Sequence, residues 1–135
     1  MQTMRIAADT NVLLRAAVRD DPQQTISAAN VLRKAYLVAV PVAALCEFAW
    51  VMRSAYKSSP LEVARSIRSL VTSPNVVTNL PAVEAGLAAL DMGGDFADGD
   101  IAYEGHWLGA EEFVSFDKQA VSLLKSQGKR ARLLS

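Results

Sequence analysis

Acidic residues at separate places in the chain could together hold a metal ion. Asp9 follows the apolar stretch MRIAA, Glu47 lies within the apolar stretch VPVAALCEFAWVM, and Asp117 ends FVSFD. The stretch GGDFADGD carries Asp95 and Asp98, which share one face if it is helical. Crowded carboxylates repel one another unless a cation neutralises them, and oxygen ligands without His or Cys suit Mg²⁺ or Mn²⁺. The expected ligands are Asp9, Glu47, Asp98 and Asp117, with Asp95 as a fifth.

Each of these acids also has an ordinary structural explanation. Asp9, Asp95 and Asp117 each precede an expected helix, where an Asp side chain can accept a backbone hydrogen bond as the N-cap. Glu47 could reach solvent through a gap or pair with a buried Arg. The last acid of GGDFADGD, Asp100, points about 200° away from Asp98 on a helix, and we expect it to be exposed.

Hydrolysis of a phosphodiester is the chemistry that such a site favours. Mg²⁺ or Mn²⁺ can activate a water molecule and stabilise a phosphate during in-line displacement. Asp9, Glu47, Asp98 and Asp117 are therefore the candidate catalytic residues. Ser115 alternates to the same side of its strand as Asp117, and could orient that carboxylate or a water molecule. Asn11 is a second candidate supporting residue.

Short apolar strands alternate with helices along the chain. The expected strands are 4–9, 36–40, 75–80, a segment within 111–117, and 131–134. The expected helices are 12–18, 21–35, 41–57, 58–73, 81–92, a segment after a loop within 93–110, and 118–127. This alternation predicts an α/β fold whose mainly parallel sheet is covered on both faces. Ligands of such sheets bind beyond the carboxyl ends of the strands, which is where Asp9 and Asp117 stand.

Composition sets broad limits on the protein class. A length of 135 residues favours one compact domain, and the single cysteine excludes an intramolecular disulfide, which suits a reducing cytoplasm. No apolar run is long enough to predict a membrane span. The net charge of zero argues mildly against nucleic-acid binding. However, the stretch KSQGKRAR concentrates four basic residues, either as a solvated helix end and edge strand or as a local basic surface.

Three stretches, taken in order and at their spacing, resemble a PIN-domain ribonuclease, specifically the VapC-type toxin of a type II toxin–antitoxin system. ADTNVLLR resembles the opening strand of the family with its first acid, Asp9. VPVAALCEFAWVM resembles the segment with the second acid, Glu47. DFADGDIAYEGHWLGAEEFVSFDK resembles the closing block, whose matching acids are Asp98 and Asp117. Asp95 matches a position that is often acidic in similar toxins.

The resemblance implies a single PIN domain over residues 1–135, an α/β/α sandwich with a short, mainly parallel central sheet of about five strands. It implies a cytoplasmic, Mg²⁺- or Mn²⁺-dependent endoribonuclease that forms a homodimer and cleaves structured RNA such as tRNA or rRNA. A VapB-like antitoxin would bind across its groove and inhibit it. Arg15 could contact an RNA phosphate or the antitoxin, or form a surface salt bridge. One departure is IAYEGHWLG, where Tyr103 and Glu104 stand at positions that are usually small.

Two other functions remain open. A PIN-fold protein without catalysis would act as a protein-binding module, although the complete acidic set argues against this. A phosphotransferase of the haloacid dehalogenase type also begins with an Asp after a strand, but it needs a second Asp where this chain has Asn11. We expect the remaining conspicuous side chains to pack in the core rather than to act on a substrate. They are Cys46, Trp50, His106 and Trp107.

Overall fold

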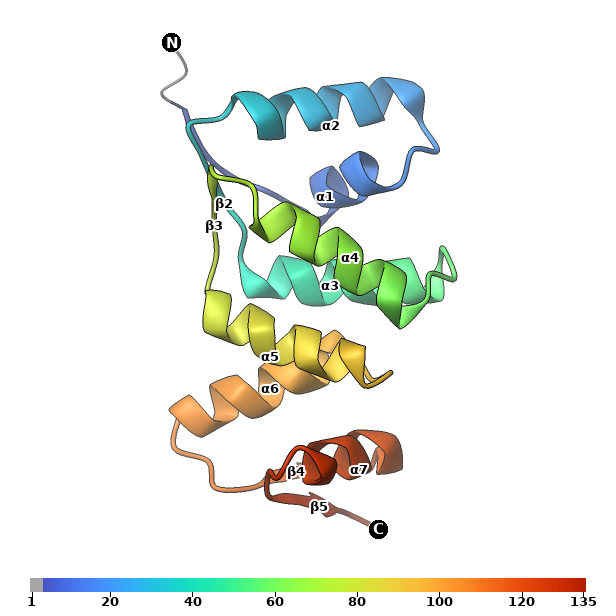
Figure 1. Ribbon diagram of the computed structural model, residues 1–135, viewed down its shortest axis with the longest axis vertical. Coiled ribbons are helices and arrows are strands. Elements are labelled where there is room, and N and C mark those ends of the chain that lie inside the picture. Colours follow the sequence, from blue (N-terminus) through green and yellow to red (C-terminus); the bar gives the residue numbers. More distant parts are fainter. Residues whose placement is uncertain (1–3) are drawn as a thin grey trace. The chain divides into compact units, whose positions relative to one another are not determined.

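The computed structural model describes residues 4–135, and in this part of the chain it contains seven helices and five strands. The α/β class is therefore confirmed (Figure 1). The chain divides into a first unit that ends at Asn79 and a second unit, Leu80–Ser135, and each is described separately. No helix among the described residues is both long and apolar enough to cross a membrane.

The first unit contains a three-stranded parallel sheet and four helices. Its elements are β1 (Arg5–Ala7), α1 (Thr10–Ala17), α2 (Pro22–Lys34), β2 (Leu37–Ala39), α3 (Val42–Ser54), α4 (Pro60–Val71) and β3 (Val76–Val77). The strand order is β1-β2-β3, with Ile6 opposite Val38 and Val38 opposite Val76. The centre of the sheet is fully buried at Val38. Parallel strands need crossover connections, and helices supply them here.

Helix α4 shows how local sequence determines an element of this unit. Pro60 occupies the first turn, where its missing N–H costs nothing. The Ser59 hydroxyl accepts a hydrogen bond from the Glu62 backbone, and the Glu62 carboxylate accepts one from the Ser59 backbone. The hydrogen bond from the Ser59 backbone is the largest cause that lowers the pKa of the Glu62 carboxyl. Val63 and Ile67, one turn apart, then form part of a buried stripe.

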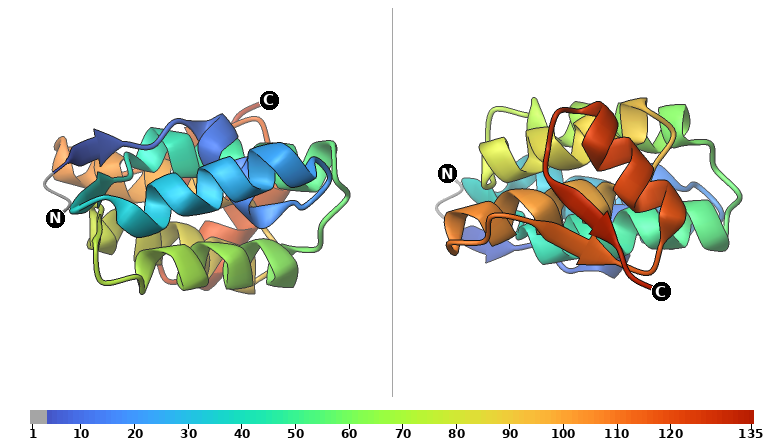
Figure 2. Two further views of the ribbon diagram at one scale, coloured as in Figure 1. Left: turned by 90° about the horizontal axis from the view of Figure 1, so that it is seen from above. Right: turned by 90° about the horizontal axis from the view of Figure 1, so that it is seen from below.

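The second unit contains three helices and a two-stranded parallel sheet. Its elements are α5 (Leu80–Asp91), α6 (Phe96–Trp107), β4 (Phe113–Ser115), α7 (Lys118–Ser126) and β5 (Ala131–Leu133). Strand β4 pairs with β5 so that Val114 lies opposite Arg132, and both strands pack against α7 (Figure 2, right). Helix α7 ends before Gly128, whose φ of 82° is the left-handed conformation expected after a helix.

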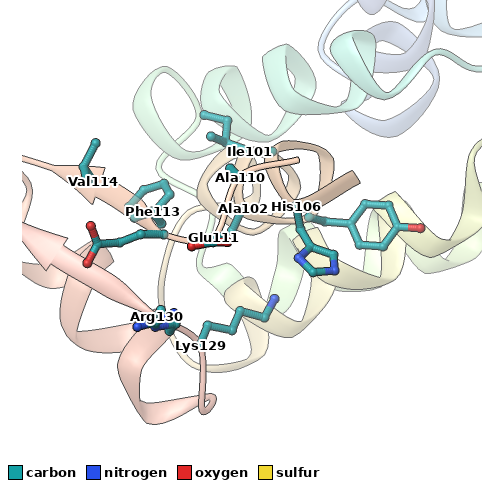
Figure 3. Close-up of a pocket in the computed structure, with 12 residues that line it drawn as sticks. Ile101, Ala102, His106, Ala110, Glu111, Phe113, Val114, Lys129 and Arg130 are labelled. Carbon is teal, nitrogen blue, oxygen red and sulfur yellow. The ribbon is translucent and has the colours of Figure 1, made fainter. Parts of the chain in front are cut away.

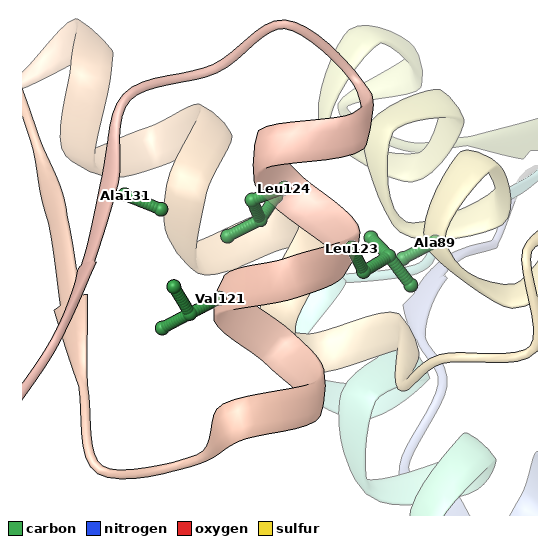
Figure 4. Packing of buried hydrophobic residues seen from close by; sticks show 5 residues of the cluster. All are labelled: Ala89, Val121, Leu123, Leu124 and Ala131. Carbon is green, nitrogen blue, oxygen red and sulfur yellow. The ribbon is translucent and has the colours of Figure 1, made fainter.

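A cluster of small and branched side chains forms a core of the second unit. It contains Ala89 of α5, Val121, Leu123 and Leu124 of α7, and Ala131 of β5 (Figure 4). Ala102 and Phe113 pack against this cluster from α6 and β4. The sheet is therefore attached to all three helices of the unit by apolar contacts.

Helices α5 and α6 pack against each other at two glycines. A Cβ atom at Gly99 would lie 2.2 Å from the carbonyl oxygen of Ala85, and one at Gly86 would lie 2.4 Å from the Phe96 ring. Neither position has room for a side chain, so the two glycines allow the backbones to approach closely. This contact fixes the position of the amino-terminal half of α6.

The expected elements are present with shorter strands and shifted ends. Helix α1 begins at Thr10 rather than at residue 12, and the strand expected at 75–80 is only Val76–Val77. The five strands fall into a three-stranded and a two-stranded sheet. The expected placement of both tryptophans in the core is wrong, because Trp50 is 69% exposed and Trp107 is 73% exposed. Each lies on the solvent side of its helix.

Candidate metal centre

Three of the five expected ligands come together in the second unit. Asp95, Asp98 and Asp117 each present one carboxylate oxygen, and these oxygens all lie within 4.8 Å of one another. Asp95 and Asp98 belong to the start of α6, and Asp117 lies two residues after the end of β4. The amino end of α6 therefore lies beside the carboxyl end of β4, where ligands of parallel sheets are expected.

Asp117 is held in place by the helix that it precedes. Its Oδ1 accepts hydrogen bonds from the backbone N–H groups of Gln119, at 2.9 Å, and Ala120, at 3.2 Å. The Ser115 hydroxyl accepts a hydrogen bond from the Asp117 backbone at 2.9 Å. Ser115 thus contacts the backbone of Asp117 rather than its carboxylate. Because both capping bonds use Oδ1, Oδ2 remains for a ligand.

Asp98 is the half-buried member of the cluster, and its pKa is raised. Burial is the largest cause, because it removes water from the charged form, and the charges of Asp95 and Asp117 add to the effect. A divalent cation would offset both unfavourable contributions by balancing most of the negative charge of the three carboxylates. The donor set consists of oxygens alone, which fits Mg²⁺ or Mn²⁺.

Asp95 occupies the N-cap position of α6 without making a capping hydrogen bond through its side chain. The helix-cap explanation for this residue is therefore not what the structure shows. Its carboxylate instead belongs to the cluster with Asp98 and Asp117.

Asp9 lies in the first unit and caps α1. Its Oδ1 accepts a hydrogen bond from the Thr10 backbone at 2.7 Å, and its side chain is exposed. The arrangement matches that of Asp117, because both follow a strand and both cap the next helix. The structure thus shows the N-cap role that the sequence left open for Asp9, and leaves its second oxygen unoccupied by that role.

Glu47 is exposed, as in the alternative in which its side chain reaches solvent. One face of α3 is buried, through Leu45, Phe48, Ala49 and Met52. Glu47 lies on the opposite face, one turn from the exposed Trp50. Helix α3 also carries apolar residues outside its buried face, so its sequence does not indicate which face is exposed. Glu47, like Asp9, belongs to the first unit.

The remaining candidates occupy less specific positions. Arg15 pairs with Asp20 at 3.4 Å, which is the surface salt bridge considered above, and Asn11 is exposed on α1. The expectation that Asp100 is exposed is wrong, because only 6% of it is accessible. It follows Gly99, where α6 lies so close to α5 that neighbouring positions are covered. His106 is exposed rather than packed.

The chain has no match among protein-family models, and no curated protein matches its sequence. The PIN-domain assignment stays a prediction that rests on the motifs of the sequence. The positions of the three carboxylates do not depend on that assignment.

Proposed function

We propose that this chain is a Mg²⁺- or Mn²⁺-dependent endoribonuclease with a PIN-like fold, acting as a VapC-type toxin. The observation that carries the proposal is the convergence of Asp95, Asp98 and Asp117 within 4.8 Å. Three carboxylates at this spacing repel one another, and a divalent cation is the partner that turns the repulsion into binding.

The residues of the cluster have different parts in the proposed reaction. Asp117 supplies a rigid ligand, since two backbone N–H groups hold its Oδ1. Asp98 is the half-buried ligand whose charge most needs neutralising, and Asp95 is an exposed ligand beside it. A bound cation supplies water activation and stabilises charge on the scissile phosphate. No nucleophilic side chain is required.

The proposal extends to the first unit. In it, residues 1–135 form one PIN-like α/β/α domain with a central sheet of five strands, and Asp9 and Glu47 complete the ligand set. The support is local: Asp9 repeats the strand-end arrangement of Asp117, and Glu47 is exposed and so accessible to a ligand. The proposal also includes a cytoplasmic homodimer and inhibition by a VapB-like antitoxin, both of which follow from the sequence resemblance.

Cleavage of structured RNA by the purified chain tests this function. Total tRNA and rRNA would be incubated with the chain in Mg²⁺, in Mn²⁺ and in excess chelator, and fragment ends would be mapped. Asp98→Asn and Asp117→Asn should abolish cleavage, whereas Glu84→Gln, an exposed acid of α5, should not. Cleavage that persists in chelator or in both cluster variants would overturn the proposal.

A catalytically inactive PIN-fold binding module is the second candidate. It is favoured by the capping bonds of Asp9 and Asp117, which give each acid a structural use without a metal. Calorimetric titration with Mn²⁺ separates the two functions. A nuclease must bind the ion in a manner that Asp98→Asn weakens, whereas a module of this kind has no need to bind it.

A further inference from the structure

A second feature of the Leu80–Ser135 unit is a groove of about 640 Å³, which we call the α6–β4 groove. Its walls come from the later part of α6, from β4 and from the loop before β5 (Figure 3). Aromatic side chains line it from two elements, Tyr103 and His106 from α6 and Phe113 from β4. Lys129 and Arg130 line it from the loop before β5, where the Arg130 carbonyl accepts a hydrogen bond from the Phe113 backbone.

The floor of the groove is apolar and firmly supported. Ala102 and Phe113 line it, and both also pack against the buried cluster around Leu124. At its edge, Ile101 is 56% exposed and Val114 is 46% exposed. Covering an apolar surface of this kind with a flat, apolar ligand is favourable, because it removes that surface from water. A supported floor also needs little rearrangement on binding.

The charge around the groove favours an anionic ligand. Lys129 and Arg130 are both exposed. Of the two acids in the lining, Glu112 is already paired with Arg132 at 3.0 Å, which leaves Glu111 as the other acid in the lining. Two cations thus face one unneutralised carboxylate. Aromatic rings beside basic side chains are the combination that binds single-stranded nucleic acid, by stacking bases and contacting phosphates.

The groove and the acidic cluster share their walls. Asp98 lies near the start of α6 and His106 near its end, eight positions later, so the two positions are about 12 Å apart along the helix. On the other wall, β4 runs from Phe113 in the groove to Ser115 beside Asp117. About 12 Å corresponds to roughly three stacked nucleotides at ~3.4 Å each.

We propose that the α6–β4 groove binds unpaired nucleotides of an RNA whose phosphodiester lies at the acidic cluster. Bases stack on Tyr103, His106 and Phe113, and the adjacent phosphates contact Lys129 and Arg130. The inference rests on the proposed nuclease function for the identity of its ligand. It adds a recognition surface about three nucleotides from the scissile bond, and it makes single-stranded segments of structured RNA the preferred substrate.

Binding is measured separately from cleavage, by fluorescence anisotropy of a short labelled single-stranded RNA in chelator. The double variant Lys129→Ala/Arg130→Ala should bind about tenfold or more weakly, and its salt dependence should fall by about 1.4 in log–log slope, at ~0.7 per lost phosphate contact. The matched control is Lys34→Ala/Lys125→Ala, which removes two exposed cations outside the groove. Equal affinities of the two double variants, or no RNA binding by the parent chain, would overturn the inference.

Cross-linking locates the bases directly. RNA that contains 4-thiouridine should cross-link to peptides that carry Tyr103, His106 or Phe113, and cross-links confined to other surfaces would overturn the inference. The failure of the proposed function is distinguishable, because RNA binding is measured in chelator, whereas cleavage is measured separately in Mn²⁺. A parent chain that binds RNA through the groove but cleaves none would refute the nuclease and leave the groove standing. Loss of self-association in the groove variant, with unchanged RNA affinity, would instead assign the groove to a second copy of the chain.

Discussion

Asp98 and Asp117 bring carboxylate oxygens within 4.8 Å of each other, from the first turn of α6 and from the second residue after β4. Nineteen positions separate them in the sequence. The turn between α6 and β4 therefore returns the chain to the place where α6 began. A pair of like charges at this distance is unfavourable by itself. Binding of a cation, or removal of one of the charges, would relieve the repulsion.

Replacing Asp98 with Asn should remove metal-dependent cleavage. The change keeps the size of the side chain but removes the charge that a divalent cation requires. Loss of a group that merely supports a metal ligand costs about 10–100-fold, so loss of a ligand should cost at least ~100-fold. Initial cleavage rates at saturating Mn²⁺ measure the effect, with Glu84→Gln as the control. Retention of more than a tenth of the parent rate would contradict the prediction.

The metal-free protein should become more stable when Asp98 is replaced by Asn, and this gain should depend on pH. Burial and the neighbouring charges raise the pKa of Asp98 in the folded chain. Below the ordinary Asp range, about pH 3.9, the group is protonated in both folded and unfolded chains, and no penalty exists. As pH rises through the raised folded pKa, the native state ionises at a cost, and stability is lost.

Urea denaturation in chelator at several pH values measures this difference. The stabilisation by Asp98→Asn should be greatest near neutral pH and should shrink as the pH falls toward 4. A gain that is constant across this range would show that packing, rather than ionisation, explains it. Addition of Mn²⁺ should reverse the order, because the parent alone then gains the binding free energy of the ion.

Glu47→Gln should separate function from stability. The side chain is exposed on α3, so the free energy of unfolding should change by no more than about 0.5 kcal/mol. If Glu47 is the proposed ligand, Mn²⁺ affinity and cleavage should nevertheless fall by at least ~10-fold. Unchanged cleavage together with unchanged stability would remove Glu47 from the ligand set and leave the cluster of the second unit in place.

Ser59→Ala should destabilise the first unit by about 1 kcal/mol, because it removes the side-chain half of the α4 capping box. Ser27→Ala is the control, since Ser27 is exposed on α2 and should be nearly neutral. Chemical denaturation of both variants measures the difference. Equal midpoints would show that the Ser59–Glu62 bonds contribute nothing measurable in solution.

Gly99→Ala should destabilise the second unit by about 1–3 kcal/mol, since the new methyl group would overlap the Ala85 carbonyl oxygen. Gly105→Ala on the same helix meets only Ala110, at 3.9 Å, and should stabilise by up to about 1 kcal/mol through helix propensity. Thermal unfolding of the two variants should therefore shift in opposite directions. Shifts of the same sign would contradict the close packing of α5 and α6.

Much of the fold follows from local signals in the sequence. Pro22 and Pro60 begin helices as expected, and Gly128 follows the end of α7. The parallel strands follow from apolar runs separated by helices. The strand lengths could not be predicted, because pairing partners rather than composition decide where a strand ends. The division of five strands between two sheets is likewise a matter of long-range contact.

The candidate site was predictable where residues are close in sequence or follow strands. Asp95, Asp98 and Asp117 meet as expected because strand ends and helix starts gather at one edge. The exposure of Glu47 could not be predicted because an almost wholly apolar helix has no periodicity to reveal its exposed face. Asp100 was misjudged because the covering contact involves Gly99, and a glycine carries no hydrophobic signal. The pair Gly86 and Gly99 was the available clue to that contact.

The close approach of α5 to α6 at Gly99 has a consequence for metal selectivity. Mg²⁺ demands near-ideal octahedral ligand positions, whereas the larger Ca²⁺ accepts more flexible ones. Asp98 is one residue from Gly99, so the backbone distance between two helices sets where this carboxylate stands. A residue without a side chain, on the side of α6 that faces another helix, would thereby determine which ions the protein can use.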